Sequence, residues 1–287
     1  MTSSQPAYKY GSDEYADGVM PPAAGPVSFG RRGDLEVRLA AGADEIDAAQ
    51  ALRYRVFYEE MSAVADDKTR RTRRDVDRFD AICDHLLVID HSLEKQQDGE
   101  SAVVGCYRLL RQEVAEQHGG FYTAGEYDIA PLLDRMGPNV RFLELGRSCV
   151  LPPYRNKPTL ELLWKGIAQY VALHNLDVMF GCASFEGTDP DKLALPLSFL
   201  HHYHAAPPEW HVRALPERYV EMNRIAEDQI DLRQALRAMP PVIKGYIRAG
   251  CYIGDGAVID HQFGTTDVLI IFPVTQINQR YRSKFTG

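Results

Sequence analysis

Three neighbouring segments restrict the possible folds more than any other part of the chain. Residues 141–151 are mostly apolar with a few charges, residues 158–174 carry apolar side chains at helical spacing, and residues 177–184 are almost entirely apolar. A short apolar run of the last kind is typical of a strand that is buried on both faces. Strand, helix and buried strand in succession predict an α/β fold, with a mixed central sheet flanked by helices.

The rest of the chain extends this pattern. Apolar alternation predicts further strands at residues 35–39, 85–90, 102–110, 257–263 and 267–274, and helical spacing predicts helices at residues 44–60 and 241–250. Residues 112–136 are expected to form a loop with a short helix, and residues 190–240 to be mostly helical. No linker divides residues 34–287, which we expect to form a single domain. Residues 1–33, rich in Gly, Pro, Ser and Ala, are expected to be a disordered tail.

Composition and charge exclude several classes of protein. The net charge of −8 argues against a nucleic-acid-binding protein, which normally has a basic domain. The five cysteines include no C-x-x-C pair, and this usage is typical of buried thiols in a reducing compartment. The chain has no apolar run of membrane-spanning length and no secretory signal at its N-terminus. We therefore expect a cytoplasmic protein, with peripheral contact to the inner face of the membrane left open.

One short segment is strongly basic within this acidic chain. Residues 68–74 hold five cations in seven positions, among them Arg70, Arg71, Arg73 and Arg74. Runs of charge usually face solvent, so a solvated loop without a partner is one interpretation. The other is a docking surface for an anionic partner.

The strongest chemical signal is a pair of charges inside the apolar strand at residues 141–151. Glu144 and Arg147 lie among apolar neighbours, and buried charges need partners because desolvation is costly. Their odd spacing puts them on opposite faces of a regular strand, but a bulge at Gly146 would bring them to one side. The two residues predict either a functional site or a structural ion pair.

Two weaker signals accompany this strand. The turn that follows it contains Arg155, Asn156 and Lys157 just before a helix, where free N–H groups and positive charge favour phosphate, although an ordinary turn has the same pattern. Asp77 and Asp80 flank an aromatic residue and would suit a cationic amine, or they could be turn and cap residues.

Metal and nucleophile chemistry have little support in the sequence. The histidines at residues 201–204 have no nearby Cys, Asp or Glu at zinc-like spacing, so we expect no metal. Neither Ser184 nor Cys149 lies on a strand–turn–helix elbow, which is where a nucleophile of that kind is normally exposed.

Several motifs, in order along the chain, resemble one family. They occupy residues 53–61, 77–80, 83–88, 105–110, 144–150, 163–167, 180–185, 240–246, 260–263 and 266–268. Together they cover roughly residues 35–285, and they resemble the L-ornithine N-alpha-acyltransferases of ornithine-lipid synthesis. That family is similar to the GNAT superfamily and to the acyl-homoserine-lactone synthases, so the resemblance implies a GNAT-like fold.

The resemblance also implies an activity. The expected reaction moves a 3-hydroxyacyl chain from acyl carrier protein to the α-amine of L-ornithine and gives lyso-ornithine lipid. The acyl-phosphopantetheine thioester is then a substrate, and no cofactor is expected. Two alternatives remain: a related synthase that acts on glycine, lysine or S-adenosylmethionine, and a non-catalytic lipid-binding protein at the membrane surface.

The same resemblance assigns roles to individual residues. Glu144 is expected to activate the amine. Arg147 and Arg108 are expected to orient Glu144 and the carboxylate of the substrate. Backbone N–H groups of Ser148, Cys149 and Val150 are expected to polarise the thioester carbonyl. Asp77 and Asp80 are expected to bind the side-chain ammonium of ornithine. The other residues expected to bind substrate are Arg55, Phe57 and Ser184.

One departure from the GNAT pattern concerns the donor. The expected phosphate-binding turn at Arg155, Asn156 and Lys157 has no glycine, which makes close backbone approach to a pyrophosphate harder. A donor that carries only phosphopantetheine on a protein fits this turn better than coenzyme A does. Acyl carrier protein is acidic, so the arginines of residues 70–74 are expected to contact it.

Overall fold

The computed structural model describes residues 26–61, 63–94 and 102–276. Within this part of the chain one sheet has eleven strands, and most neighbours are antiparallel. Ten of them follow one another from edge to edge, and β9 (Tyr219–Val220) pairs with β10 off this path. The order is β1 (Ser28–Arg32), β2 (Leu35–Leu39), β3 (Asp84–Asp90), β4 (Val103–Arg111), β6 (Phe142–Val150), β7 (Val178–Glu186), β11 (Thr265–Pro273), β10 (Tyr252–Asp260), β8 (Arg213–Ala214) and β5 (Tyr127–Asp128).

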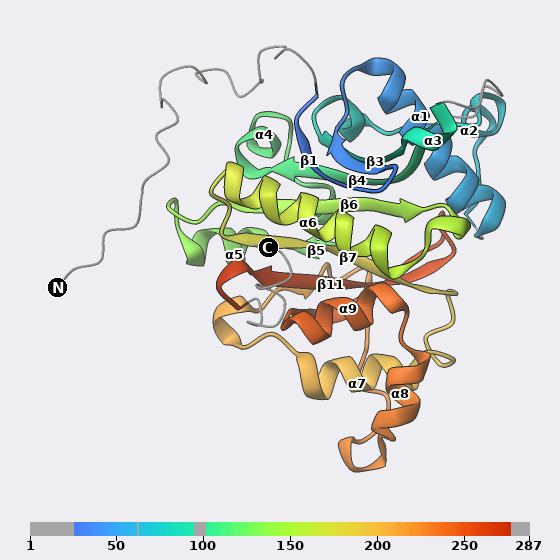
Figure 1. Ribbon diagram of the computed structural model, residues 1–287. Helices are drawn as coiled ribbons and strands as arrows, with labels where there is room; N and C mark the ends of the chain where they lie inside the picture. Colours follow the sequence, from blue (N-terminus) through green and yellow to red (C-terminus); the bar gives the residue numbers. More distant parts are fainter. Residues whose placement is uncertain (1–25, 62, 95–101, 277–287) are drawn as a thin grey trace.

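Helices cover both faces of this sheet (Figure 1). One face packs against α6 (Lys157–Leu173) and α9 (Pro241–Ala249). The opposite face packs against α1 (Ala43–Tyr54), α4 (Gln112–Gln117) and α5 (Ala130–Met136). The remaining helices are α2 (Asp67–Thr72), α3 (His91–Glu94), α7 (Ala194–His204) and α8 (Leu232–Ala238), with short turns η1 (Arg55–Glu60, π-helical), η2 (Arg78–Ala81), η3 (Tyr122–Gly125), η4 (Pro152–Tyr154), η5 (Pro208–Trp210), η6 (Glu227–Gln229) and η7 (Val274–Gln276).

The two central strands separate part of the way along their length. β6 and β7 run parallel but pair only from Phe142 to Glu144, although each is nine residues long. Gly181 follows the last paired residue of β7 and has a φ of 155°. A side chain at this position would collide with the carbonyl oxygen of Leu145, so only glycine allows the approach. Beyond it, β6 follows β4 and β7 follows β11, which opens a gap between the strands.

The structure confirms the mixed sheet and most of the predicted strands and helices, and it corrects three predictions. Residues 28–32, which lie within the expected disordered tail, form strand β1, and residues 1–25 of that tail lie outside the described part. The basic run is helical rather than a loop, because Asp66 accepts a hydrogen bond from the Thr69 N–H and caps α2. Residues 190–240 are less helical than expected, because tertiary pairing makes the two-residue strands β8 and β9. No helix among the described residues is long and apolar enough to cross a bilayer.

Candidate active site

Charged side chains form a band across the sheet face that carries α1, α4 and α5. Most of them are buried, and because burial of a charge is costly, each needs a partner or a function. They come from α1, η2, the loops beside η2 and η3, and strands β4, β6, β10 and β11. We call this set the polar band: Arg53, Asp75, Asp77, Asp80, Arg108, Glu126, Glu144, Arg147, Asp260 and Asp267.

Glu144 lies near the middle of the band, on β6 at the point where β6 and β7 separate. Its side chain is buried, with 5% of the residue exposed. The carboxylate accepts hydrogen bonds from the backbone N–H groups of Tyr122, at 2.9 Å, and Thr123, at 2.6 Å. Burial raises the pKa of Glu144 despite these two bonds, and a carboxylate with a raised pKa is better suited to accept a proton near neutral pH.

The predicted bulge in β6 is present one residue beyond Gly146. Gly146 faces Arg108 of β4 and Cys149 faces Cys106, so β6 has one more residue than β4 over this stretch. Arg147 occupies the extra space with a left-handed φ of 50°. Arg147 and Ser148 have no registered partner on β4, so the pairing of β4 and β6 is interrupted here. The backbone N–H groups expected to polarise a carbonyl lie beside this interruption.

The bulge brings Arg147 to the same side of the strand as Glu144. Its guanidinium lies 4.9 Å from the ring centre of Tyr122 and 4.7 Å from that of Phe263, distances typical of cation–π contacts. The backbone of Tyr122 also donates to Glu144, so one residue links the two charges. The sequence-based alternative of a direct structural ion pair is not what forms, because Arg147 instead binds Asp75 at 3.1 Å and Asp77 at 3.2 Å.

One half of the polar band balances its charges internally. We call it the paired half: Arg53, Arg108, Arg147, Asp75, Asp77 and Asp80. Arg53 is only 1% exposed and its guanidinium lies 2.8 Å from a carboxylate oxygen of Asp75 and 2.8 Å from one of Asp80. Three guanidinium groups thus lie against three carboxylates, an arrangement that holds the wall of the site rigid.

Asp77 and Asp80 both belong to the paired half, but their carboxylates differ in exposure and in the number of partners. Asp80 accepts bonds from both Arg53 and Arg108 and from the backbone N–H of Asp77. Burial by itself would raise the pKa of Asp80, but the two arginines outweigh it and hold the pKa at about 2. Its oxygens are therefore engaged, and it positions arginines instead of offering an open ammonium site. Asp77 is more exposed, at 23% of its side chain, but it also faces Arg108 and Arg147.

Two arginines of the helical segment before this half, Arg53 and Arg55, lie in different surroundings. Arg55 is exposed at the first turn of η1, whereas Arg53, two residues earlier, is the arginine that reaches the carboxylates. The change to π-helical turns at Arg55 follows directly after Arg53. Phe57 does face inward, where its ring meets the edge of Phe263 at 5.6 Å.

The other half of the band lacks this balance. Glu126, Asp260 and Asp267, which we call the acidic cluster, have carboxylate oxygens within 4.8 Å of one another. Burial, together with the neighbouring carboxylates, raises the pKa of Glu126 to about 7 and that of Asp267 to about 6. Sequence analysis gave these residues no role. The signal was present at Asp267, a charge inside an apolar strand just as Glu144 is.

The predicted donor residues lie at the N-terminus of α6. The Asn156 side chain accepts from the Thr159 N–H at 3.1 Å and caps the helix. Arg155 donates to the carbonyl of Val150 at 2.9 Å and forms a two-bond ion pair with Glu60. Lys157 is exposed, 3.7 Å from Glu161. Asn156 and Arg155 are therefore engaged within the protein, in the helix cap and in the ion pair. Lys157 is the cation of this turn that is most accessible to a phosphate.

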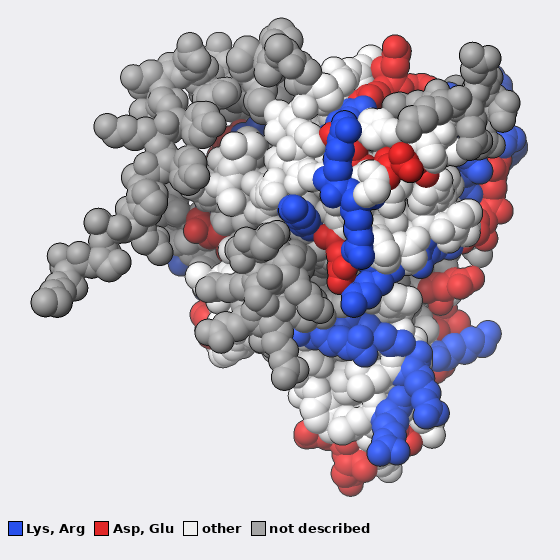
Figure 2. All heavy atoms as spheres, in the orientation of Figure 1, with Lys and Arg blue, Asp and Glu red and all other residues white. Residues whose placement is uncertain are grey.

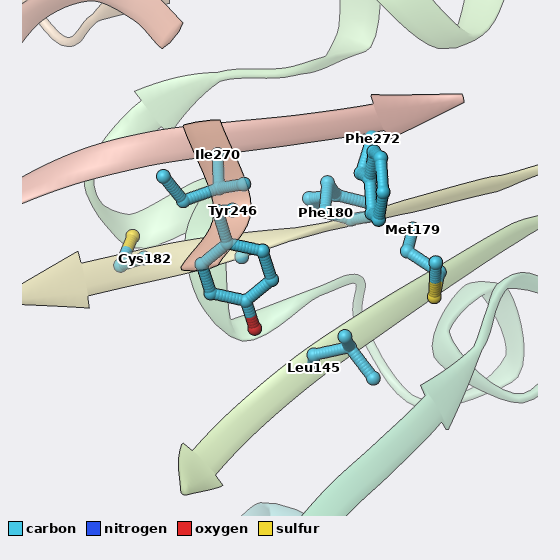
Figure 3. Close-up of a pocket in the computed structure, with 8 residues that line it drawn as sticks. Leu145, Met179, Phe180, Cys182, Tyr246, Ile270 and Phe272 are labelled. Atoms are coloured by element: carbon cyan, nitrogen blue, oxygen red, sulfur yellow. The ribbon is translucent and has the colours of Figure 1, made fainter. Parts of the chain in front are cut away.

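A narrow apolar pocket lies where β6 and β7 separate, on the face covered by α9 (Figure 3). Tyr246 of α9 lies over β7 with its hydroxyl directed toward β6. The pocket is lined by Leu145, Met179, Phe180, Gly181, Cys182, Tyr246, Ile270 and Phe272. Ser184, further along β7, is half-buried and faces Asp267 of β11 in the strand register. The pocket and the polar band therefore meet at the strand gap from opposite faces of the sheet.

The chain is similar to several known proteins. Residues 52–165 match the family described as acetyltransferase (GNAT) domain. An L-ornithine N(alpha)-acyltransferase from Agrobacterium fabrum is 55% identical over 259 residues, which cover 90% of this chain and 87% of that protein. One from Rhizobium meliloti is 55% identical, with 88% and 84% covered. Among solved structures, an N-acyl amino acid synthase from uncultured soil microbes aligns with a TM-score of 0.46 and 10% identity, over 87% of this chain and 94% of that one.

Proposed function

Because this chain belongs to the family of L-ornithine N(alpha)-acyltransferases, we propose that it transfers a 3-hydroxyacyl chain from acyl carrier protein to the α-amine of L-ornithine. The product would be lyso-ornithine lipid. The observation that supports this most directly is Glu144, a buried carboxylate with a raised pKa at the gap between β6 and β7. A base at that position lies where an amine and a thioester can meet.

The chemistry needs one proton transfer and one acyl transfer. The amine nitrogen attacks the thioester carbonyl carbon, a C–N bond forms, and the C–S bond breaks. Glu144 takes the proton that the amine loses, and the departing phosphopantetheine sulfur finally holds that proton as a thiol. The backbone break beside Ser148 is our candidate for the N–H groups that stabilise the oxyanion of the tetrahedral intermediate.

The arginines of the band have different roles in this proposal. Arg147 is the candidate to bind the α-carboxylate of the acceptor, because its guanidinium lies over Tyr122, whose backbone also binds Glu144. Arg108 is a positioning residue, since it lies 4% exposed and bound to Asp77 and Asp80. A carboxylate held at Arg147 would place the adjacent α-amine toward Glu144.

The donor is proposed to enter from the α6 side of the strand gap. The lining of the pocket matches an acyl chain in its apolar chemistry, but the cavity of about 10 Å³ must widen to admit one. The N-terminus of α6, with Lys157 exposed, suits the single phosphate of phosphopantetheine. Two ion pairs, Arg73 with Glu59 and Arg155 with Glu60, place the end of α2 and the start of α6 on either side of η1. A carrier protein bound at α2 is therefore close enough to deliver its prosthetic group to α6.

The decisive experiment measures thiol release from 3-hydroxyacyl carrier protein with a panel of amines. L-ornithine should be the preferred acceptor over glycine, L-lysine and S-adenosylmethionine. Glu144→Gln should lower turnover about 100-fold or more while leaving the fold intact, since general-base catalysis is typically worth that factor. Preference for another amine would point to a related synthase. Thiol release by none of them would favour a lipid-binding protein.

Carrier docking can be tested at α2 with a matched control. Arg70→Glu with Arg71→Glu should weaken the carrier complex at low salt, and the effect should shrink as salt screens exposed charges. Arg73 and Arg74 are left unchanged because they bind Glu59 and Asp47 on other elements, whereas Arg70 contacts only its own segment, at Asp67 and the carbonyl of Ala65.

The control uses a second basic region. Figure 2 shows Lys and Arg side chains over the face that carries α6 and α9 and near α8. Arg233→Glu with Arg237→Glu, two exposed positions on α8, changes the net charge equally. Weaker binding in the control and not in the α2 variant would move the docking surface to that face.

A further inference from the structure

The acidic cluster carries more negative charge than its protein surroundings neutralise. The only ion pair that the described residues give it joins Glu126 to Arg218 at 4.0 Å, and that arginine is partly exposed and also donates to the carbonyl of Gly125. Asp260 uses one oxygen to accept from the backbone N–H groups of residues 262 and 263. Buried carboxylates in this state are costly unless a cation completes the site.

Two buried oxygen atoms beside the cluster lack a well-aligned partner. Asp267 Oδ1 and Thr265 Oγ1 make no well-aligned hydrogen bond among the described residues, and the two residues are only 7% and 3% exposed. Burial keeps the pKa of Asp267 raised, although the hydroxyls of Ser184 and Thr265 lie near enough to its carboxylate to lower that pKa in part. They are two positions apart on β11, so their side chains share a face, and Asp260 of β10 is registered against Thr265. Native proteins rarely leave such atoms unsatisfied, so both point to a ligand that donates hydrogen bonds.

We propose that the acidic cluster binds the side-chain ammonium of the acceptor amino acid and so selects a diamino acid over a neutral one. This inference rests on the proposed function. An ammonium group is a compact cation with three N–H donors and no acceptor, which matches a set of carboxylates and a buried hydroxyl. A calcium or magnesium ion would need six or more oxygen ligands, and here a thiol, that of Cys182, lies against Glu126 at 3.1 Å.

The position of the cluster relative to Glu144 supports this assignment. Glu144 binds the N–H of Thr123, the hydroxyl of Thr123 lies 4.0 Å from the sulfur of Cys182, and that thiol donates to Glu126. A short series of contacts therefore leads from the proposed base to the cluster, through η3 and Cys182 of β7. An amino acid with its α-amine at Glu144 can extend its side chain along this series of contacts.

The residues that border the cluster leave part of their surface exposed. Cys182, Ser184 and Phe263 border it and are only partly buried. The carboxylates expected from sequence to receive the ammonium, Asp77 and Asp80, are instead bound by guanidinium groups. The acidic cluster is thus the region of the polar band where an additional positive charge is favoured electrostatically.

The test compares L-ornithine with L-norvaline, which has the same carbon chain without the terminal amine. Asp267→Asn, Asp260→Asn and Glu126→Gln should each raise the KM for ornithine at least about tenfold, the usual loss for one charge-assisted hydrogen bond. The KM for norvaline should stay the same or fall. Asp255→Asn is the matched control. Asp255 lies on β10, as Asp260 does, but it pairs with Arg213 at 3.4 Å outside the polar band.

A second measurement avoids variants that fold poorly. Ornithine should raise the melting temperature of the unaltered protein more than norvaline does at the same concentration. Equal effects of the substitutions on both acceptors, or equal stabilisation by both, would overturn the inference. Activity that disappears with a chelator and returns with calcium or magnesium, except in Asp267→Asn, would show a metal site instead. Failure of the unaltered protein to acylate ornithine would refute the proposed function before any variant is compared.

Discussion

The paired half and the acidic cluster both bury carboxylates on one face of the sheet, but they differ in what surrounds those carboxylates. Asp80 lies between Arg53 and Arg108, and its pKa is held at about 2. Asp267 lies among other carboxylates, and burial raises its pKa to about 6. The first group neutralises its own charges and serves as a fixed wall, with Arg147 as the one member proposed to contact the acceptor. The second is incomplete, which is what a binding site for a cation requires.

The largest expected effect comes from removing a cation of the paired half. Arg53→Met should lower the free energy of unfolding by about 3–5 kcal/mol, because it leaves Asp75 and Asp80 buried with one partner fewer. Chemical denaturation at neutral pH measures this. Arg55→Met, an exposed position two residues away, should change stability by less than about 0.5 kcal/mol. Similar losses in both variants would remove the distinction between a paired and an exposed arginine.

The acidic cluster should respond in the opposite direction. Asp267→Asn should raise the free energy of unfolding by about 2–3 kcal/mol at pH 7–8, since the pKa of Asp267 moves from 3.8 to about 6 on folding and each unit is worth about 1.4 kcal/mol. A thermal melt beside the ornithine assay would show a variant that gains stability and loses acceptor selectivity. Destabilisation at every pH would mean that the carboxylate has a structural partner.

The pH dependence separates the two regions further. Glu126 and Asp267 bind protons more tightly in the folded state, so their contribution to stability is full below about pH 4 and is lost as pH rises through about 6–7. Asp80 binds its proton less tightly when folded, so its contribution is present above about pH 4 and is lost as pH falls toward 2. The stability gained by Asp267→Asn should therefore grow between pH 4 and 7, while the stability lost in Asp80→Asn should shrink toward pH 2. If the effects of the two substitutions changed with pH in the same direction, the proposed difference between the paired half and the acidic cluster would be wrong.

The smallest effect is expected where charges pair at the surface. Arg74→Ala removes an exposed ion pair with Asp47 at 2.8 Å and should cost less than about 1 kcal/mol. Comparison with Arg53→Met would show how much of the energy of pairing depends on burial. A loss as large as that of Arg53→Met would show that α2 has a structural role beyond its surface charge.

The features that sequence analysis predicted well are those that a single segment displays. The strands around residues 141–151 and 177–184, the helix that separates them and the charges of Glu144 and Arg147 are visible in local patterns, and so is the possible bulge. The paired half is not local, because Arg53 meets residues 22 and 27 positions away, and no pattern distinguishes it from Arg55.

The acidic cluster was missed for a related reason. Its three residues come from a loop and two strands, and only the assembled sheet brings them together. The short strands β8 and β9 were missed because two residues carry no periodicity of their own.

The bulge in β6 also changes the phase of the strand. Leu145 and Val150 are five positions apart, yet both pack in the core against α6, which an uninterrupted strand would not allow. Before Arg147 the odd-numbered side chains of β6 face α6, whereas after it the even-numbered ones do. Deleting one residue here would restore a regular ladder and turn Cys149 and Val150 to the wrong faces, while most substitutions would leave the ladder unchanged. The length of this strand, and not only its composition, is consequently under constraint.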